Sequence, residues 1–136
     1  MKKLIGLSVL TTISYLLYTD REISLVGAWK ADGRKTVHSM IEAGELNTNA
    51  DVKNLVSAIG DATYIFTEKT LDISFESNPN FKEIPIPYKI LEKTDNSITI
   101  HYPISPTKNN QDTYHLTADG KCIYIERKKY NDYFCK

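Results

Sequence analysis

The sequence predicts an α+β domain, mainly β, in which an antiparallel meander curls into a barrel or half-barrel. Three observations lead to this fold class. Apolar and polar residues alternate with period two from Thr63 onward, two stretches of helical spacing precede them, and turn residues separate the short segments. Short antiparallel strands with one apolar face must curl or pair to hide that face from water. We therefore expect one domain over residues 23–136, with two short helices inserted after its first strand.

The first strand and the first helix are expected between residues 23 and 44. The strand covers residues 23–30 and carries the only tryptophan of the chain, Trp29. Asp32 is placed to cap a helix over residues 34–43, and Gly44 follows as its stop. Three apolar side chains lie three and four residues apart, as one face of a helix requires: Val37, Met40 and Ile41.

A second helix is expected directly after the first. Thr48 or Asn49 is its predicted N-cap, and Gly60 is its predicted end. The helical spacing recurs in four apolar residues between these limits: Val52, Leu55, Val56 and Ile59. Both helices therefore precede the main run of strands.

About six strands are expected after the helices. Pro85 and Pro87 lack the N–H that a strand interior needs, so their strand is predicted to begin at a sheet edge or at a bulge. Asp119-Gly120 is a strong hairpin signal, and the return strand after it covers residues 122–127. The alternating apolar positions that define the earlier strands are Tyr64, Phe66, Leu71, Ile73, Phe75, Ile84, Ile86, Tyr88, Ile90, Ile98, Ile100, Tyr102, Tyr114 and Leu116.

Residues 1–18 have the layout of a signal peptide or of an uncleaved signal anchor. Lys2 and Lys3 precede an apolar run that continues without a charge up to Asp20. The run is short for a membrane span, and no small-residue cleavage motif follows it, so both alternatives stay open. We expect export to the periplasm, the cell envelope or the medium, with membrane contact only through this segment if it is retained.

Cys122 and Cys135 are the only cysteines, and they lie close together near the C-terminus. In an exported protein such a pair is predicted to form a disulfide, which would tie residues 130–136 back onto the last strand. The alternative is two free thiols.

The charge balance argues against a nucleic-acid partner. The chain has 17 basic and 17 acidic residues, and without Lys2 and Lys3 the basic residues are fewer than the acidic ones. Binding to nucleic acid requires a clustered positive field that neutralises phosphates. We expect no nucleic-acid partner and no strong attraction to anionic lipid headgroups.

The segment Gly27-Ala28-Trp29 is similar to the G-x-W signature of lipocalins and other calycin-like barrels. The tail Tyr133-Phe134-Cys135, with the helical pair and the meander, resembles small uncharacterised bacterial secreted proteins called lipocalin-like. The resemblance implies that Trp29 plugs the closed end of the barrel and that an arginine from the last strand packs across its ring. Arg127 is the position that matches this arginine. The structural residues implied are therefore Gly27, Trp29 and Arg127.

The sequence offers little for catalysis or for a metal. His101 and His115 are expected on one polar strand face, where they can lie opposite each other, but a stable metal site needs further ligands that we do not identify. His38 is expected on the surface of the first helix. No serine-nucleophile motif and no phosphate-binding glycine loop is present. We predict no catalytic residue, no metal site and no cofactor.

The predicted function is that of an exported, non-catalytic binding module for a small apolar or amphipathic ligand. Tyrosines can line a barrel with a flat apolar body and a polar tip, although they also fill ordinary cores. The alternative is a structural or protein-interaction domain of the cell envelope, with a solid core and no ligand pocket. The strand tyrosines in question are Tyr64, Tyr88, Tyr102, Tyr114 and Tyr124.

Overall fold

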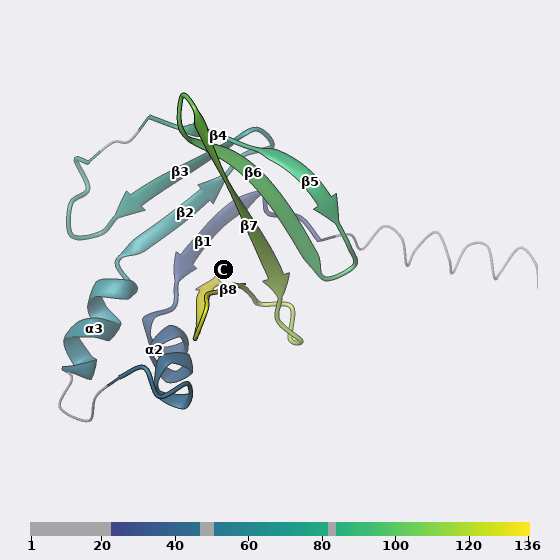
Figure 1. Cartoon of the computed structure of the whole chain (residues 1–136). Helices are drawn as coiled ribbons and strands as arrows, with labels where there is room; N and C mark the ends of the chain where they lie inside the picture. The colour runs from purple at the N-terminus through teal and green to yellow at the C-terminus, as the bar shows by residue number, and fades with distance from the viewer. Residues whose placement is uncertain (1–22, 47–50, 82–83) are drawn as a thin grey trace, which may run out of the picture.

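The computed structural model describes residues 23–46, 51–81 and 84–136, which form two helices and nine strands (Figure 1). All strand pairs are antiparallel, and together they make one strongly curved sheet. The predicted fold class is therefore confirmed, with both helices following the first strand. The predicted leader, residues 1–18, lies outside the described residues.

The first strand lies in the interior of the sheet. Strand β1 lies between β2 and β9, and the full order is β4-β3-β2-β1-β9-β8-β7-β6-β5. The strands are β1 (Gly27–Ala31), β2 (Ala62–Phe66), β3 (Thr70–Phe75), β4 (Ile86–Pro87), β5 (Lys89–Lys93), β6 (Ser97–Ser105), β7 (Lys108–Leu116), β8 (Cys122–Glu126) and β9 (Asn131–Cys135).

One continuous segment joins the two edges of the sheet. Only Tyr88 separates β4 from β5, yet β4 pairs with β3 and β5 pairs with β6, at opposite ends of the strand order. Strands β4 and β6 are in contact as a result, and the sheet is nearly closed. Tyr88 is buried and meets the ring of Phe66 edge-on at 5.7 Å between centroids. Pro87 lies in the short edge strand β4, in agreement with the prediction made from its lack of a backbone N–H.

Helix α2 (Gly33–Glu42) begins at the predicted cap, since the Asp32 side chain accepts a hydrogen bond from the N–H of Lys35 at 3.0 Å. Its buried face differs from the prediction. Val37 is buried as predicted, but Ile41 is 50% exposed, and the other buried residues of the helix are Gly33 and Thr36. The face is shifted because α2 packs against β9 through its hydroxyl-bearing residues.

Beyond the last residues that β1 pairs with β9, helix α2 takes over the contact with β9. Direct strand pairing ends at Ala31 and Phe134. Beyond it, Thr36 Oγ1 accepts a hydrogen bond from the N–H of Tyr133 at 2.9 Å, and Ser39 Oγ accepts one from the N–H of Asn131 at 2.7 Å. These hydroxyls satisfy backbone groups of β9 that no strand covers.

Helix α3 (Val52–Ile59) packs closely on the start of α2. Its N-cap is Asp51, whose side chain accepts from the N–H of Asn54 at 3.2 Å, so the predicted caps Thr48 and Asn49 are wrong; both lie outside the described residues. A side chain at Gly33 would place Cβ 2.0 Å from the carbonyl oxygen of Val56, so this contact requires glycine. Among the described residues, no helix has the length and apolar character needed to cross a membrane.

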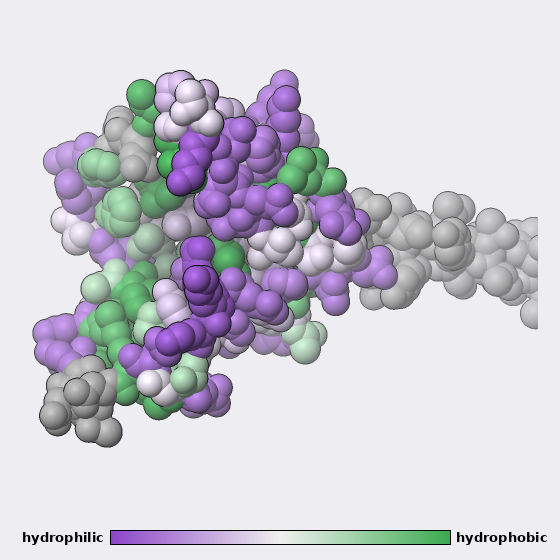
Figure 2. All heavy atoms as spheres, viewed as in Figure 1, coloured by the Kyte–Doolittle hydropathy of each residue, from purple (hydrophilic) through white to green (hydrophobic). Residues whose placement is uncertain are grey.

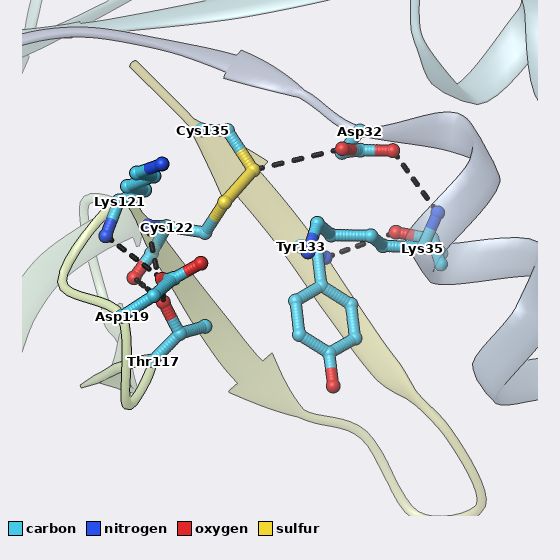
Figure 3. Close-up of a disulfide and its surroundings, with 9 residues drawn as sticks. Asp32, Lys35, Thr117, Asp119, Lys121, Cys122, Tyr133 and Cys135 are labelled. Atoms are coloured by element: carbon cyan, nitrogen blue, oxygen red, sulfur yellow. Dashed lines mark hydrogen bonds between the residues drawn. A yellow bond between two sulfur atoms is a disulfide. The ribbon is translucent and has the colours of Figure 1, made fainter.

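The predicted C-terminal tail is a ninth strand, and a disulfide fixes it to β8. Cys122 and Cys135 are direct cross-strand partners with 4.1 Å between their Cα atoms, and they form the predicted bridge (Figure 3). Asp32 Oδ2 lies 3.6 Å from Cys135 Sγ. Such a disulfide hints at an oxidising, exported environment.

The core lies inside the curve of the sheet. Side chains alternate in and out along each strand, so every second residue contributes to it. The face shown in Figure 2, by contrast, carries many polar residues, with apolar ones gathered mainly near the helices. The most fully buried strand residues are Phe66, Ile98, Ile100, Tyr114, Ile123 and Phe134.

Candidate functional site

Trp29 closes one part of the barrel interior. Its side chain is buried, and the indole N–H donates to the carbonyl oxygen of Leu25 at 2.7 Å. Ile23 and Leu25, which precede β1, are buried in the same core. The indole therefore has its one polar group satisfied and fills the interior as a large apolar body. We call this region the Trp29 end.

The cation over the Trp29 ring is Lys136 rather than the predicted Arg127. Lys136 Nζ lies 4.6 Å from the ring centroid. The register explains the difference: Lys30 pairs with Cys135, which puts Lys136 opposite Trp29. Arg127 begins the turn at the other end of the β8–β9 hairpin, where its N–H donates to the carbonyl oxygen of Tyr130 at 2.8 Å.

Gly27, the third predicted structural residue, lies beside this cation. Its φ of +130° is a conformation that residues with side chains rarely adopt. A Cβ at this position would lie 3.4 Å from Lys136 Nζ. Glycine at this position therefore allows the backbone conformation at the start of β1 and leaves space for the Lys136 ammonium.

Arg127 belongs to an inward-facing polar cluster, which we call the mouth network. Strand alternation directs its members inward. Asp112 lies two residues before the buried Tyr114 on β7, and Asp132 lies two residues before the buried Phe134 on β9, so each points to the same face as its buried neighbour. Tyr102 follows Ile100 in the same way on β6. The members are Tyr102, Asn110, Asp112, Arg127 and Asp132.

The mouth network is connected by hydrogen bonds and ion pairs. The Tyr102 hydroxyl donates to Asp112 Oδ2 at 2.6 Å and accepts from Asn110 Nδ2 at 2.7 Å. Arg127 lies between the two carboxylates, with Nη1 3.9 Å from Asp112 Oδ1 and Nη2 3.4 Å from Asp132 Oδ2. The Asp112 and Asp132 side chains are only 12% and 22% exposed. Two carboxylates and one guanidinium leave the network with one net negative charge.

The electrostatics of the network keep its tyrosine protonated. Burial, together with the hydrogen bond to Asp112 and its negative charge, raises the pKa of Tyr102 to about 12. Burial alone would lower the pKa of Arg127, but Asp132 and Asp112 outweigh it, and the net shift is upward. The tyrosine is thus held as a neutral donor and the arginine as a cation.

An apolar pocket of about 390 Å³ adjoins the network along the line where β4 approaches β6. Tyr102 belongs to both, because it lines the pocket and its hydroxyl is bonded to Asp112. Two of the pocket's isoleucines are largely exposed, Ile84 at 87% and Ile104 at 57%. We call this the seam pocket; its lining is Ile84, Ile86, Tyr102, Pro103 and Ile104.

A second pocket, of about 170 Å³, lies between the two helices and the sheet. Asp132 lines it and so joins it to the mouth network. The aromatic residues Tyr64, Tyr130 and Phe134 line it from the strands and from the β8–β9 turn. Thr36 and Met40 of α2 and Ile59 of α3 are among the residues that complete it. We call this the helix pocket.

A larger hollow lies at the start of α2, and several of the polar groups in its lining are already paired. It measures about 670 Å³ and extends from the start of α2 to the disulfide. Lys30 and Glu76 in its lining form an ion pair at 2.6 Å. Asp61 accepts a hydrogen bond from the N–H of Ser77 at 2.8 Å. We therefore regard the mouth network and its two pockets as the better candidate site.

The two histidines are not opposite each other, contrary to what the sequence allowed. His101 pairs with Gln111, and His115 pairs with Ser97. Instead, His115 stacks on Tyr124 with 5.1 Å between ring centroids. Within the described parts of the chain, no group of three or more His, Cys, Asp or Glu side chains could hold a metal ion.

Sequence analysis named Tyr102 and Arg127 but missed the other members of the mouth network, Asn110, Asp112 and Asp132. The signal was present in the alternation, since Asp112 continues the inward series of Tyr114 and Leu116, and Asp132 precedes Phe134 by two residues. A carboxylate at an inward position of a barrel strand is the pattern that would have marked these residues. Of the strand tyrosines, Tyr124 lies on the outward series, because its neighbours Ile123 and Ile125 are buried.

Comparisons with known proteins support the fold and go no further. The solution NMR structure of the protein yxeF is similar to this chain, with a TM-score of 0.52 and 16% sequence identity over 85% of this chain and 73% of that one. No protein-family model and no curated protein sequence matches the chain. The nearly closed antiparallel barrel fits a calycin-like architecture.

Proposed function

We propose that this protein is an exported, non-catalytic binding module for a small amphipathic ligand, which it holds at the mouth of the barrel. The observation that carries the proposal is the position of Tyr102. Tyr102 lines an apolar pocket, while its hydroxyl belongs to a polar network that faces the barrel interior. A ligand with an apolar body and a polar group matches both surfaces.

The size and chemistry of the seam pocket support binding of a small molecule. Ligand pockets typically measure about 300–1,000 Å³ and are mostly apolar, with a few well-placed polar groups. The seam pocket, at about 390 Å³, falls in this range. Keeping Asp112 and Asp132 inside a barrel is costly in desolvation unless they are compensated, and apolar residues would fill the same space more stably. Retaining the network is therefore better explained by recognition than by stability.

The state of the network favours binding over catalysis. The Tyr102 hydroxyl is engaged on both sides, donating to Asp112 and accepting from Asn110. Its raised pKa disfavours the phenolate that a general base would need at neutral pH. The polar groups are thus suited to fixed hydrogen bonding rather than to proton transfer.

Binding can be tested with the neutral fluorophore N-phenyl-1-naphthylamine, which brightens in apolar surroundings. We expect saturable binding by the wild-type protein. Ile104→Glu places a charge in the seam pocket at a residue that is 57% exposed, and should weaken the binding about tenfold or more. Ile65→Glu is the matched control, because Ile65 is 39% exposed on the outward series of β2.

Two results would contradict this function. One is the absence of saturable fluorescence with the folded wild-type protein. The other is equal weakening by Ile104→Glu and Ile65→Glu, which would show that the probe binds the surface without using the seam pocket. Circular dichroism on each variant separates loss of binding from loss of fold.

A second candidate function, a protein-interaction domain, is favoured by the free edge of β5. Among the described strands β5 pairs only with β6, and all five of its residues are exposed. Ile90 and Leu91 are 50% and 55% exposed on this edge, where another strand can add. Native mass spectrometry of the protein from its own envelope fraction distinguishes the two. A retained small molecule supports the first function, whereas a bound polypeptide that Leu91→Lys removes supports the second.

A further inference from the structure

We propose that the helix pocket is a separate site for a small organic ammonium ion. Three observations support it: aromatic rings around the pocket, one carboxylate in its lining, and a volume that suits a compact head group. This site goes beyond the proposed function, because none of the residues that line the seam pocket lines the helix pocket. The two pockets meet only through the mouth network, so a substitution in the lining of the seam pocket tests that site without changing the lining of the helix pocket.

The aromatic lining of the helix pocket suits a cation. Tyr64 and Phe134 lie with 4.5 Å between their ring centroids, and Tyr130 contributes a third ring from the β8–β9 turn. The faces of aromatic rings carry negative charge density and attract ammonium groups within about 6 Å. Met40 of α2 and Ile59 of α3 complete an apolar wall that suits methyl or methylene groups.

Asp132 supplies the charge that makes the pocket selective for a cation. Among the described residues that line the pocket, it is the only aspartate, glutamate, lysine or arginine. Its side chain is 22% exposed, so the carboxylate is largely withdrawn from water. An anion entering the pocket would face this carboxylate with no cation in the lining to offset it. A neutral ligand has no charge that the carboxylate could attract, so the carboxylate would not strengthen its binding.

Arg127 does not neutralise this site completely. Its Nη2 lies 3.4 Å from Asp132 Oδ2, beyond the roughly 2.7–2.9 Å of a strong charge-assisted hydrogen bond. Its other terminal nitrogen faces Asp112 at 3.9 Å, so one guanidinium is shared by two carboxylates. The net negative charge of the network is therefore available to a second cation next to Asp132.

The volume limits the ligand to a small head group. At about 30 Å³ per water molecule, a pocket of about 170 Å³ holds five or six waters. A trimethylammonium group is small enough to fit this space. The chemical class is therefore a small alkylammonium ion, free or as the head of a larger molecule.

The decisive experiment compares choline with 3,3-dimethyl-1-butanol, its neutral isostere, by NMR titration of the folded protein. We expect choline to bind at least about tenfold more tightly than the alcohol, because the two differ only in charge. Asp132→Asn should remove this preference. Tyr130→Leu, at a half-buried turn residue, should weaken choline binding several-fold while leaving the fold intact.

Matched controls lie on the outward faces of strands. Asp72→Asn changes an acid between the inward residues Leu71 and Ile73, and Tyr124→Leu changes an aromatic residue on the outward series of β8. Both should leave choline binding unchanged, as should Ile104→Glu in the seam pocket. Three outcomes would overturn the site: no choline binding, equal binding of choline and the alcohol, or unchanged binding in both Asp132→Asn and Tyr130→Leu.

Discussion

The Trp29 end and the mouth of the barrel are built by the same strands, yet their inward residues differ in kind. On β7 the inward series changes from buried Tyr114 to Asp112, and on β9 it changes from buried Phe134 to Asp132. On β8 it changes from buried Ile125 to Arg127, which follows the strand directly. Each change takes one step of two residues, or about 7 Å along a strand.

The difference suggests a division of roles within one core, with the Trp29 end providing stability and the mouth providing recognition. Buried apolar and aromatic side chains stabilise the Trp29 end through burial and dispersion. Charged groups at the mouth contribute little net stability, because their mutual attraction roughly offsets their desolvation. Variants at the two ends should therefore behave differently, and the following predictions run from the largest expected effect to the smallest.

Trp29→Ala should cost about 3–5 kcal/mol of unfolding free energy, as large-to-small substitutions of buried aromatic residues do. Trp29 is 3% exposed, and its indole N–H is hydrogen-bonded to Leu25. Urea denaturation measures the change, with Leu91→Ala on the exposed edge strand as a control that should change little. A loss below about 1 kcal/mol for Trp29→Ala would contradict the assignment of stability to this end.

Reducing the disulfide should cost about 3 kcal/mol, the value the chain-entropy model gives for a loop of this length, with 13 residues of sequence separation. The melting temperature should then fall by about 10 °C. The bridge holds the end of β9 on β8, next to the position of Lys136 over Trp29. Thermal melts with and without dithiothreitol test this. A Cys122→Ser/Cys135→Ser variant is the control, and its melt should not respond to the reductant.

Arg127→Met should cost about 1–2 kcal/mol, less than the ~3–5 kcal/mol typical when one partner of a fully buried ion pair is removed. The smaller value is expected because the Arg127 side chain is 38% exposed and both of its ion pairs are long. Lys129→Met is the matched control. The Lys129 side chain is 69% exposed, so its ion pair with Glu45 should contribute almost nothing to the free energy of unfolding. Equal urea midpoints for the two variants would show that the mouth network is not coupled.

The Tyr102→Phe variant should lose less stability than the wild type as the pH rises above about 10. The pKa of Tyr102 is raised to about 12 in the folded protein, so the unfolded chain ionises first as pH rises above about 10. Stability linked to this tyrosine is therefore complete below about pH 10 and is lost progressively as pH rises toward 12. Urea midpoints between pH 9 and pH 11.5 measure the slope. Parallel curves for variant and wild type would exclude Tyr102 from this linkage.

Lys136→Met should have the smallest effect, about 0.5–1 kcal/mol, because it removes one cation–π contact at an exposed residue. The same substitution at Lys121, which is exposed and has no ring contact among those described, is the control. If Lys136→Met costs no more than Lys121→Met, the ammonium does not stabilise the Trp29 end.

Local signals predicted much of the secondary structure. Asp32 caps the first helix as expected because its side chain, placed just before the helix, can accept from a free backbone N–H. Period-two alternation located the strands between Thr63 and residue 127, and the disulfide followed from the cysteine spacing, but strand β9 was expected only as a tail. The N-cap of the second helix was missed because Asp51 offers the same short polar side chain as the two residues that were predicted.

The partners of each side chain were harder to predict. Arg127 was expected over Trp29, yet the register of β9 with β1 puts Lys136 there. His101 and His115 were expected to be able to face each other, and the β6–β7 register separates them. A shift in register changes every cross-strand neighbour, and alternation within a single strand carries no information about it.

The sequence by itself determined which residues turn inward, where the first helix starts, and that Cys122 and Cys135 are close enough in the chain to join. These properties depend on neighbours within a few positions, so local patterns suffice to specify them. Only the tertiary structure decided that Tyr88 links the two sheet edges, that Lys136 covers Trp29, and that Asp112, Arg127 and Asp132 meet. These contacts join distant segments, and their geometry depends on strand order and register, which only the packing of the whole sheet fixes.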